Sequence, residues 1–154
     1  MATRNGKPAI TYEIYVGAPA SKVWRGLVDG ELTKQYVYGT RFNGELKPGA
    51  PYAYLGEGDW KVVEGKLLDV KAHERLAMTW RAQWDEAVKD DRPSRVTYEL
   101  VPTGPDVTRL RVVHDDFDAE TATYRGSVDA WPMMLSSLKT LLECGRALAF
   151  PQGG

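Results

Sequence analysis

The sequence predicts an α+β fold, a curved antiparallel sheet of about six or seven strands wrapped around one long C-terminal helix. Two observations support it: apolar and polar residues alternate through most of the chain, and one extended stretch near the end has helical periodicity. The 154 residues fit one domain, which we expect to span residues 1–154 with a core at about 8–149.

The N-terminal part predicts one strand followed by two short helices. Apolar and polar residues alternate from Ile10 to Val16, which indicates a strand with one buried face. Ala18-Pro19 begins the first helix, since proline is favoured in the first helical turn, and Asp29-Gly30 ends it. The second helix is expected over residues 31–37, before Gly39.

The middle of the chain reads as strands separated by turns. Alternation predicts strands over residues 52–54, 60–70, 76–84, 96–100 and 110–114. Gly65 interrupts the second of them and marks a bulge or a close approach of two backbones. Residues 85–92 form a charged loop. Because parallel neighbours need long crossovers, these strands predict an antiparallel meander.

The end of the chain carries the longest amphipathic segment. Its apolar stripe consists of Val128, Trp131, Leu135, Leu138 and Leu142, and it is widened by Met134 and Leu141. Gly145 is the expected stop. The start is open: Pro132 lies in the first turn if Asp129 is the N-cap, and predicts a kink if Ser127 is. Only this helix can cover the apolar face of the sheet, so we expect a cavity between them.

Composition excludes several classes of function. Lys and Arg total 20 against 21 Asp and Glu, so the chain has no strong positive electrostatic potential to attract nucleic acid or an anionic membrane. No apolar run approaches the length of a membrane span, and the polar N-terminus lacks a signal peptide. The single Cys144 cannot form an internal disulfide or a thiolate zinc site. We expect a cytoplasmic protein without metal or cofactor.

His114, Tyr98 and Glu64 are the weak candidates for catalysis. His114 shares a strand face with Leu110 and Val112, which points it inward, where it could act as a general base or merely bond a neighbour. Tyr98 also faces inward and could bond a ligand oxygen or a buried carbonyl. Glu64 is an acid if it turns inward and a solvated strand residue otherwise.

The predicted cavity is aromatic. Trp80, Trp84 and Trp131 face it from both sides. Plain core packing is the alternative for each. The expected lining is Trp80, Tyr98, His114, Trp131, Leu135 and Leu138, with Tyr36 and Tyr54 at the entrance.

The order of elements and several segments resemble a known superfamily. These segments are residues 18–24, 31–36, 63–65, 76–80, 94–100, 114–117 and 131–143. The chain, from about Ile10 to Leu148, resembles the START-like helix-grip (SRPBCC) superfamily. Within it, the similarity is greatest to bacterial single-domain proteins of the branch named for the activator of heat-shock protein 90 ATPase, C-terminal domain.

The resemblance implies a cavity between sheet and helix, typically for a hydrophobic ligand, and supplies no shared catalytic motif. Our first hypothesis is therefore a protein that binds a hydrophobic or aromatic small molecule, such as a lipid, polyketide or flavonoid-like compound. The second is a cavity enzyme of the cyclase, aromatase or dehydratase type that uses His114. The third is a co-chaperone-like interaction module with a chaperone as partner. Monomer and homodimer both stay open.

Overall fold

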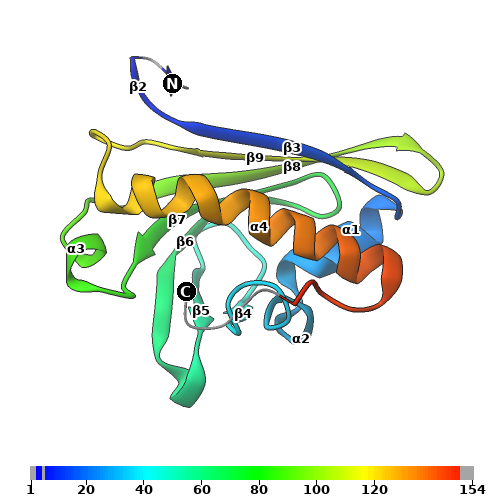
Figure 1. The fold of residues 1–154 in the computed structure, drawn as a ribbon, viewed down its shortest axis with the longest axis horizontal. Helices are drawn as coiled ribbons and strands as arrows, with labels where there is room; N and C mark the ends of the chain where they lie inside the picture. Colours follow the sequence, from blue (N-terminus) through cyan, green and yellow to red (C-terminus); the bar gives the residue numbers. More distant parts are fainter. Residues whose placement is uncertain (1–2, 5, 150–154) are drawn as a thin grey trace.

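The computed structural model describes residues 3–4 and 6–149, and it confirms the α+β helix-grip architecture (Figure 1). Among these residues, seven strands form one antiparallel sheet in the order β3–β9–β8–β7–β6–β5–β4, and β1 pairs with β2 separately. The strands are β1 (Thr3–Arg4), β2 (Lys7–Pro8), β3 (Ile10–Val16), β4 (Arg41–Gly44), β5 (Pro51–Leu55), β6 (Lys61–Lys71), β7 (Arg75–Ala82), β8 (Ser94–Gly104) and β9 (Val107–Asp115). The helices are α1 (Ala20–Val28), α2 (Gly30–Thr33), the 3-10 turn η1 (Glu57–Asp59), α3 (Glu86–Lys89) and α4 (Ala122–Cys144).

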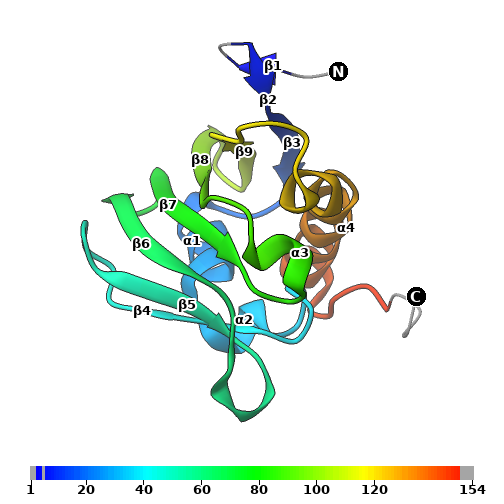
Figure 2. The ribbon, with the colours of Figure 1, turned by 90° about the vertical axis from the view of Figure 1, so that its left-hand side faces the viewer.

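The sheet and α4 form the two layers of the molecule. Figure 1 shows α4 crossing the face of the sheet, with α1 and α2 together at one end of it. The view in Figure 2, turned by 90°, places the curved sheet on one side and α4 on the other. The space between these layers is therefore where the core and any cavity must lie.

The alternation in the strands separates an apolar inner face from a charged outer face. Leu110 of β9, Val96 of β8 and Met78 of β7 are completely buried. On the outer face Arg111 lies between Glu13 and Glu99 in register, with ion-pair distances of 2.8 Å and 4.0 Å. Burial of the inner face provides the main driving force for packing α4 against the sheet.

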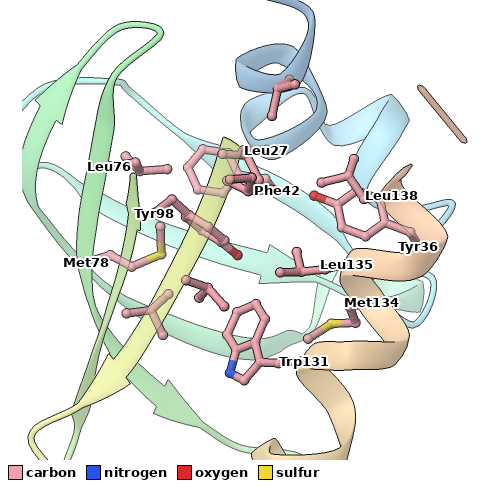
Figure 3. Packing of buried hydrophobic residues seen from close by; sticks show 14 of the residues in the cluster. Leu27, Tyr36, Phe42, Leu76, Met78, Tyr98, Trp131, Met134, Leu135 and Leu138 are labelled. Atoms are coloured by element: carbon pink, nitrogen blue, oxygen red, sulfur yellow. The ribbon is translucent and has the colours of Figure 1, made fainter. Parts of the chain in front are cut away.

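The inner face is densely filled. Figure 3 shows Trp131, Leu135 and Leu138 of α4 pointing toward the sheet, where Met78 and Tyr98 lie. Trp131 is 2% exposed and Leu138 is completely buried. Much of the volume expected to be a cavity is therefore packed core.

The helix α4 is longer than the sequence predicted. It begins after Thr121, whose side chain accepts a hydrogen bond from the backbone N–H of Tyr124 at 3.2 Å, so neither Asp129 nor Ser127 is the N-cap. Asp91 stabilises this end from a distant loop by accepting from the Thr123 N–H at 2.8 Å. Pro132 consequently lies inside the helix.

The predicted C-terminal stop of α4 is confirmed. Gly145 takes a left-handed φ of 87°, and its N–H bonds the carbonyl oxygen of Leu141 at 2.9 Å. Two side chains near this end hold the helix against the edge strand β3. Lys139 Nζ donates to the carbonyl oxygen of Tyr15 at 2.8 Å, and Glu143 accepts from the Gly17 N–H at 2.6 Å.

Two predicted boundaries were wrong, and the charged loop predicted over residues 85–92 contains the helix α3, whose Val88 is buried. The second helix was expected over residues 31–37 but ends at Thr33, because the next hydrogen bonds are those of tight turns, such as Gln35 N–H to the carbonyl oxygen of Leu32 at 3.0 Å. Tyr38 and Gly39 then take left-handed φ angles of 49° and 75°. The strand expected over residues 76–84 ends at Ala82, since Asp85 caps α3 by accepting from the Val88 N–H. Trp84 therefore lies beyond the strand and is 41% exposed.

Gly65 marks a close approach, and the strand irregularity lies elsewhere. A Cβ atom at this position would lie 2.3 Å from the carbonyl oxygen of Thr79 on the neighbouring strand, so only glycine fits. The register between β6 and β7 shifts between Leu67 and Asp69, a few residues further on.

Candidate functional site

A buried hydrogen-bonded chain links α4 to the sheet. The indole Nε1 of Trp131 donates to His114 Nδ1 at 3.0 Å. His114 Nε2 lies 2.7 Å from Ser94 Oγ, which is also 3.4 Å from the carbonyl oxygen of Trp80. Because Nδ1 accepts from an indole, which can only donate, the neutral ring carries its proton on Nε2 and donates it to Ser94.

These hydrogen bonds leave neither ring nitrogen of His114 free. Burial lowers the pKa of His114 to about 3, so the ring is neutral near pH 7. Phe117 packs against the ring with a centroid distance of 4.6 Å. A general base needs an available lone pair, and the only one on this ring accepts from Trp131. In this arrangement His114 positions Trp131.

A small pocket opens beside this hydrogen-bonded network, between the N-terminal half of α4 and strands β5, β6 and β7. Its volume is about 60 Å³. The lining contains no charged side chain; its polar groups are the hydroxyls and indole N–H groups of otherwise apolar or aromatic residues. It consists of Val37, Tyr38, Thr40, Tyr54, Val62, Val63, Trp80, Trp84, Ser127, Ala130, Trp131 and Met134.

The walls of the pocket combine large rings from the sheet with small residues from α4. Trp80 lies 5.5 Å from Tyr54 and 5.7 Å from Trp131, measured between ring centroids. From α4, the small residues Ser127 and Ala130 line the pocket together with Trp131 and Met134. Short side chains at this part of the helix leave the space that larger ones fill further along it.

Two aromatic residues on irregular backbone border the pocket on its solvent side. Tyr38 is 67% exposed and stands on the left-handed turn after α2. Trp84 lies near Gly126 of α4, where an added Cβ would be 3.6 Å from the indole ring. Neither ring belongs to a helix or a strand, so both can move with less disturbance of the fold than the core residues.

Trp80 has an unusual hydrogen-bonding state. Its side chain is 5% exposed, and its indole N–H has no hydrogen-bond partner among the described residues. A buried donor without a partner costs about 1–3 kcal/mol, so such groups are rare in folded proteins. This donor belongs to a residue that lines the pocket.

The structure brings only part of the predicted lining to this pocket. Trp80, Trp131 and Tyr54 line it. The other predicted residues lie in the packed core outside the lining: Tyr36, Tyr98, His114, Leu135 and Leu138.

The buried tyrosines are suited to hydrogen bonding and not to proton abstraction. The hydroxyl of Tyr36 donates to the carbonyl oxygen of Gly26 at 2.7 Å. Burial raises the pKa of Tyr54 to about 12 and that of Tyr98 well above its usual range. Both phenols therefore stay protonated near neutral pH.

Glu64 is not part of the pocket lining. It accepts a short hydrogen bond from Gln83 Nε2, and its carboxylate lies 4.0 Å from Lys61 Nζ. Its neighbours Val62 and Val63 do line the pocket.

Sequence reasoning missed about half of the residues that line the pocket. Val37 and Tyr38 fell in or beside a predicted helix, and Val62 was read only as strand. Ser127 and Ala130 carried a signal that was not used: with Gly126 they put small residues on one stretch of an otherwise bulky helix. Met134 belonged to the widened apolar stripe.

Within the described part of the chain, no group of three or more His, Cys, Asp or Glu residues could hold a metal ion. The carboxylates at the end of β9 and just beyond it are engaged by arginines: Arg92 bonds Asp116 and Asp118, and Arg95 makes two 2.9 Å bonds to Asp115. None of the helices in residues 3–4 and 6–149 is long and apolar enough to span a membrane.

A curved antiparallel sheet that grips one long helix, with two short helices after its first long strand, defines the helix-grip class of α+β proteins. The chain belongs to the family described as Activator of Hsp90 ATPase homolog 1-like protein, whose profile matches residues 17–143. This confirms the resemblance noted in the sequence.

Solved structures share the fold. A protein from Mesorhizobium loti is 25% identical over 88% of this chain and 97% of its own, with a TM-score of 0.73. The Aha1 dimer from Colwellia psychrerythraea is 16% identical over 91% of this chain and 99% of its own, with a TM-score of 0.72. An Hsp90 activator from Plasmodium falciparum is 16% identical over 87% of this chain and 95% of its own, with a TM-score of 0.70. No curated protein matches the chain significantly.

Proposed function

We propose that this protein binds a small, flat, hydrophobic or aromatic molecule in the pocket between α4 and strands β5–β7. The observation that carries the proposal is the lining itself, which is apolar and aromatic with isolated polar groups and no charged side chain. Ligand sites have this character. An uncharged aromatic molecule would pack against the rings of Trp80, Trp84 and Trp131.

Binding requires the pocket to widen. Its volume of about 60 Å³ corresponds to roughly two water molecules, whereas ligand sites span about 300–1,000 Å³. The residues best able to move aside are the exposed Tyr38 and Trp84 at the entrance and Met134, which has a flexible side chain. The chain from Trp131 through His114 to Ser94 holds the inner wall fixed.

A thermal-shift screen against variants at two neighbouring helix positions tests the proposal. The panel holds fatty acids, sterols, flavonoid-like phenolics and polyketide-like aromatics. Ala130→Phe fills the pocket, while Val128→Phe places the same ring at a 40% exposed position of α4 outside the lining. A compound at a hundred times its Kd stabilises by about 2.7 kcal/mol, which raises the Tm by several degrees.

The expected result is a shift with one chemical class in the wild-type protein and in Val128→Phe, and none in Ala130→Phe. A shift that persists unchanged in Ala130→Phe would place the ligand elsewhere. Absence of any shift with ligand-free protein would reject binding of the tested classes.

Contact with a chaperone is the second candidate, and the family match favours it. It predicts that this protein at tens of micromolar stimulates the ATPase of an Hsp90-type chaperone. Such stimulation in Ala130→Phe, at the wild-type level, would show an activity independent of the pocket. No stimulation in the wild-type protein would reject this candidate.

A further inference from the structure

The unpaired indole N–H of Trp80 indicates the chemistry of the ligand. We infer that the molecule bound in this pocket is uncharged and carries a hydrogen-bond acceptor, such as a ketone, ester or quinone oxygen, that the Trp80 N–H binds. This inference rests on the proposed function and adds to it the one polar contact that would select among hydrophobic compounds.

The surrounding side chains do not supply the missing acceptor. His114, whose ring centroid is 5.7 Å from that of Trp80, has both nitrogens engaged by Trp131 and Ser94. Ser94 bonds the backbone carbonyl oxygen of Trp80, not its indole. The network therefore ends beside Trp80 and leaves its side-chain donor unused.

The complementary group must be an acceptor because an indole N–H can only donate. It must be neutral because the lining offers no cation. An ionised carboxylate placed there would lose its hydration without gaining an ion pair, which is strongly unfavourable. An uncharged carbonyl oxygen loses less hydration and pairs with the N–H.

The hydrogen bond to Trp80 favours ligands that carry an acceptor over ligands that lack one. A ligand without an acceptor leaves the Trp80 N–H buried and unpaired, as it is in the free protein. A ligand with one satisfies that donor. Selectivity for the acceptor then comes from a group that the fold already buries, which is how hydrogen-bonding sites reject analogues that lack the partner.

Acetophenone and α-methylstyrene provide a matched pair of probes, since one has C=O where the other has C=CH2. Their Kd values are measured by NMR titration with wild-type protein and with Trp80→Phe. The two probes differ in hydration, but this difference is the same for every protein variant. It therefore cancels when the ratio of the two Kd values is compared between variants. We expect Trp80→Phe to reduce the preference for the ketone by about threefold to tenfold. The control is Trp84→Phe, which alters the same lining and should change both Kd values by the same factor.

The wild-type protein gives a second measurement that does not depend on the folding of a variant. The indole N–H resonance of Trp80 should move downfield with acetophenone and not with α-methylstyrene, while that of Trp24, outside the lining, should stay in place. If both probes bind but the ratio and the resonance do not respond to the carbonyl, the acceptor inference is overturned and the pocket stands. If neither probe binds, the proposed pocket itself fails.

Discussion

Two tryptophans that touch the same space have opposite hydrogen-bonding states. Trp131 of α4 and Trp80 of β7 have ring centroids 5.7 Å apart, and both are nearly completely buried. The N–H of Trp131 bonds His114, whereas the N–H of Trp80 has no partner in the described residues. Both indoles line the pocket, but only that of Trp80 keeps an unpaired donor.

The difference shows how the fold separates stability from binding. Trp131, His114 and Ser94 belong to α4, β9 and β8, so their hydrogen bonds join the helix to two central strands. Trp80 lies near the end of β7, where the strand leaves the sheet at Ala82. Trp80 is the register partner of Ser94, the first residue of β8, so the bonded network and the unpaired donor lie side by side at the same end of the sheet.

The largest expected effect is the loss of the Trp131 side chain. Trp131→Ala should lower the free energy of unfolding by about 3–5 kcal/mol, because it removes a side chain that is 2% exposed and packed in the core. Urea denaturation followed by circular dichroism measures the loss. Trp60→Ala, at a position that is 48% exposed, should change stability by no more than about 0.5 kcal/mol. A loss below about 1 kcal/mol for Trp131→Ala would mean that the ring is not close-packed.

Phenylalanine substitutions isolate the hydrogen bond from the ring. Trp131→Phe and Trp80→Phe remove similar volumes, but only the first deprives His114 Nδ1 of its donor. A buried acceptor left unpaired costs about 1–3 kcal/mol, and Trp80→Phe in contrast removes an unpaired donor, so Trp131→Phe should be the more destabilising of the two by at least that amount. Denaturation of both variants under the same conditions gives the difference directly. Equal losses would contradict the contrast between the two indoles.

The inward direction of these side chains could be predicted from the sequence, but their pairing could not. Alternation along β9 put His114 on the face of Leu110 and Val112, and helical spacing put Trp131 on the face of Leu135. Which ring nitrogen meets which indole depends on the rotation of α4 and on the register of β8 against β9. Those are set by contacts distant in sequence, such as Asp91 with Thr123 and Glu143 with Gly17.

The position of the pocket was harder to predict for a related reason. Sequence reasoning placed a cavity at the centre, where aromatic residues are dense, yet those rings fill the centre and leave space only where Ser127 and Ala130 are small. The entrance depends on Tyr38, whose left-handed φ of 49° has no signature in a stretch that resembles a helix. Backbone outliers and local volume are properties of the assembled fold.

The smallest expected effect is the pH dependence that His114 contributes. Its pKa is lowered to about 3 in the folded protein from 6.5 in the unfolded chain. The unfolded state therefore takes up the proton first as pH falls. The stability that the neutral His114 contributes is intact above pH 6.5, declines between pH 6.5 and pH 3, and does not change below pH 3. From pH 6 to pH 5 it should amount to about 1 kcal/mol of lost stability.

Urea denaturation at pH 7, 6 and 5 measures this slope, and the two histidines of the chain provide a matched pair. His114→Gln should remove the slope between pH 6 and pH 5, since glutamine can accept from Trp131 and donate to Ser94 without titrating. His73→Asn changes an exposed histidine with a left-handed φ of 69°, a conformation that asparagine tolerates, and should leave the slope as in the wild type. A slope that survives in His114→Gln would mean that other groups cause it. The pKa of His114 would then lie near its ordinary value. In that case water would have to reach the ring between Trp131 and Ser94, and this part of the core would not be closed.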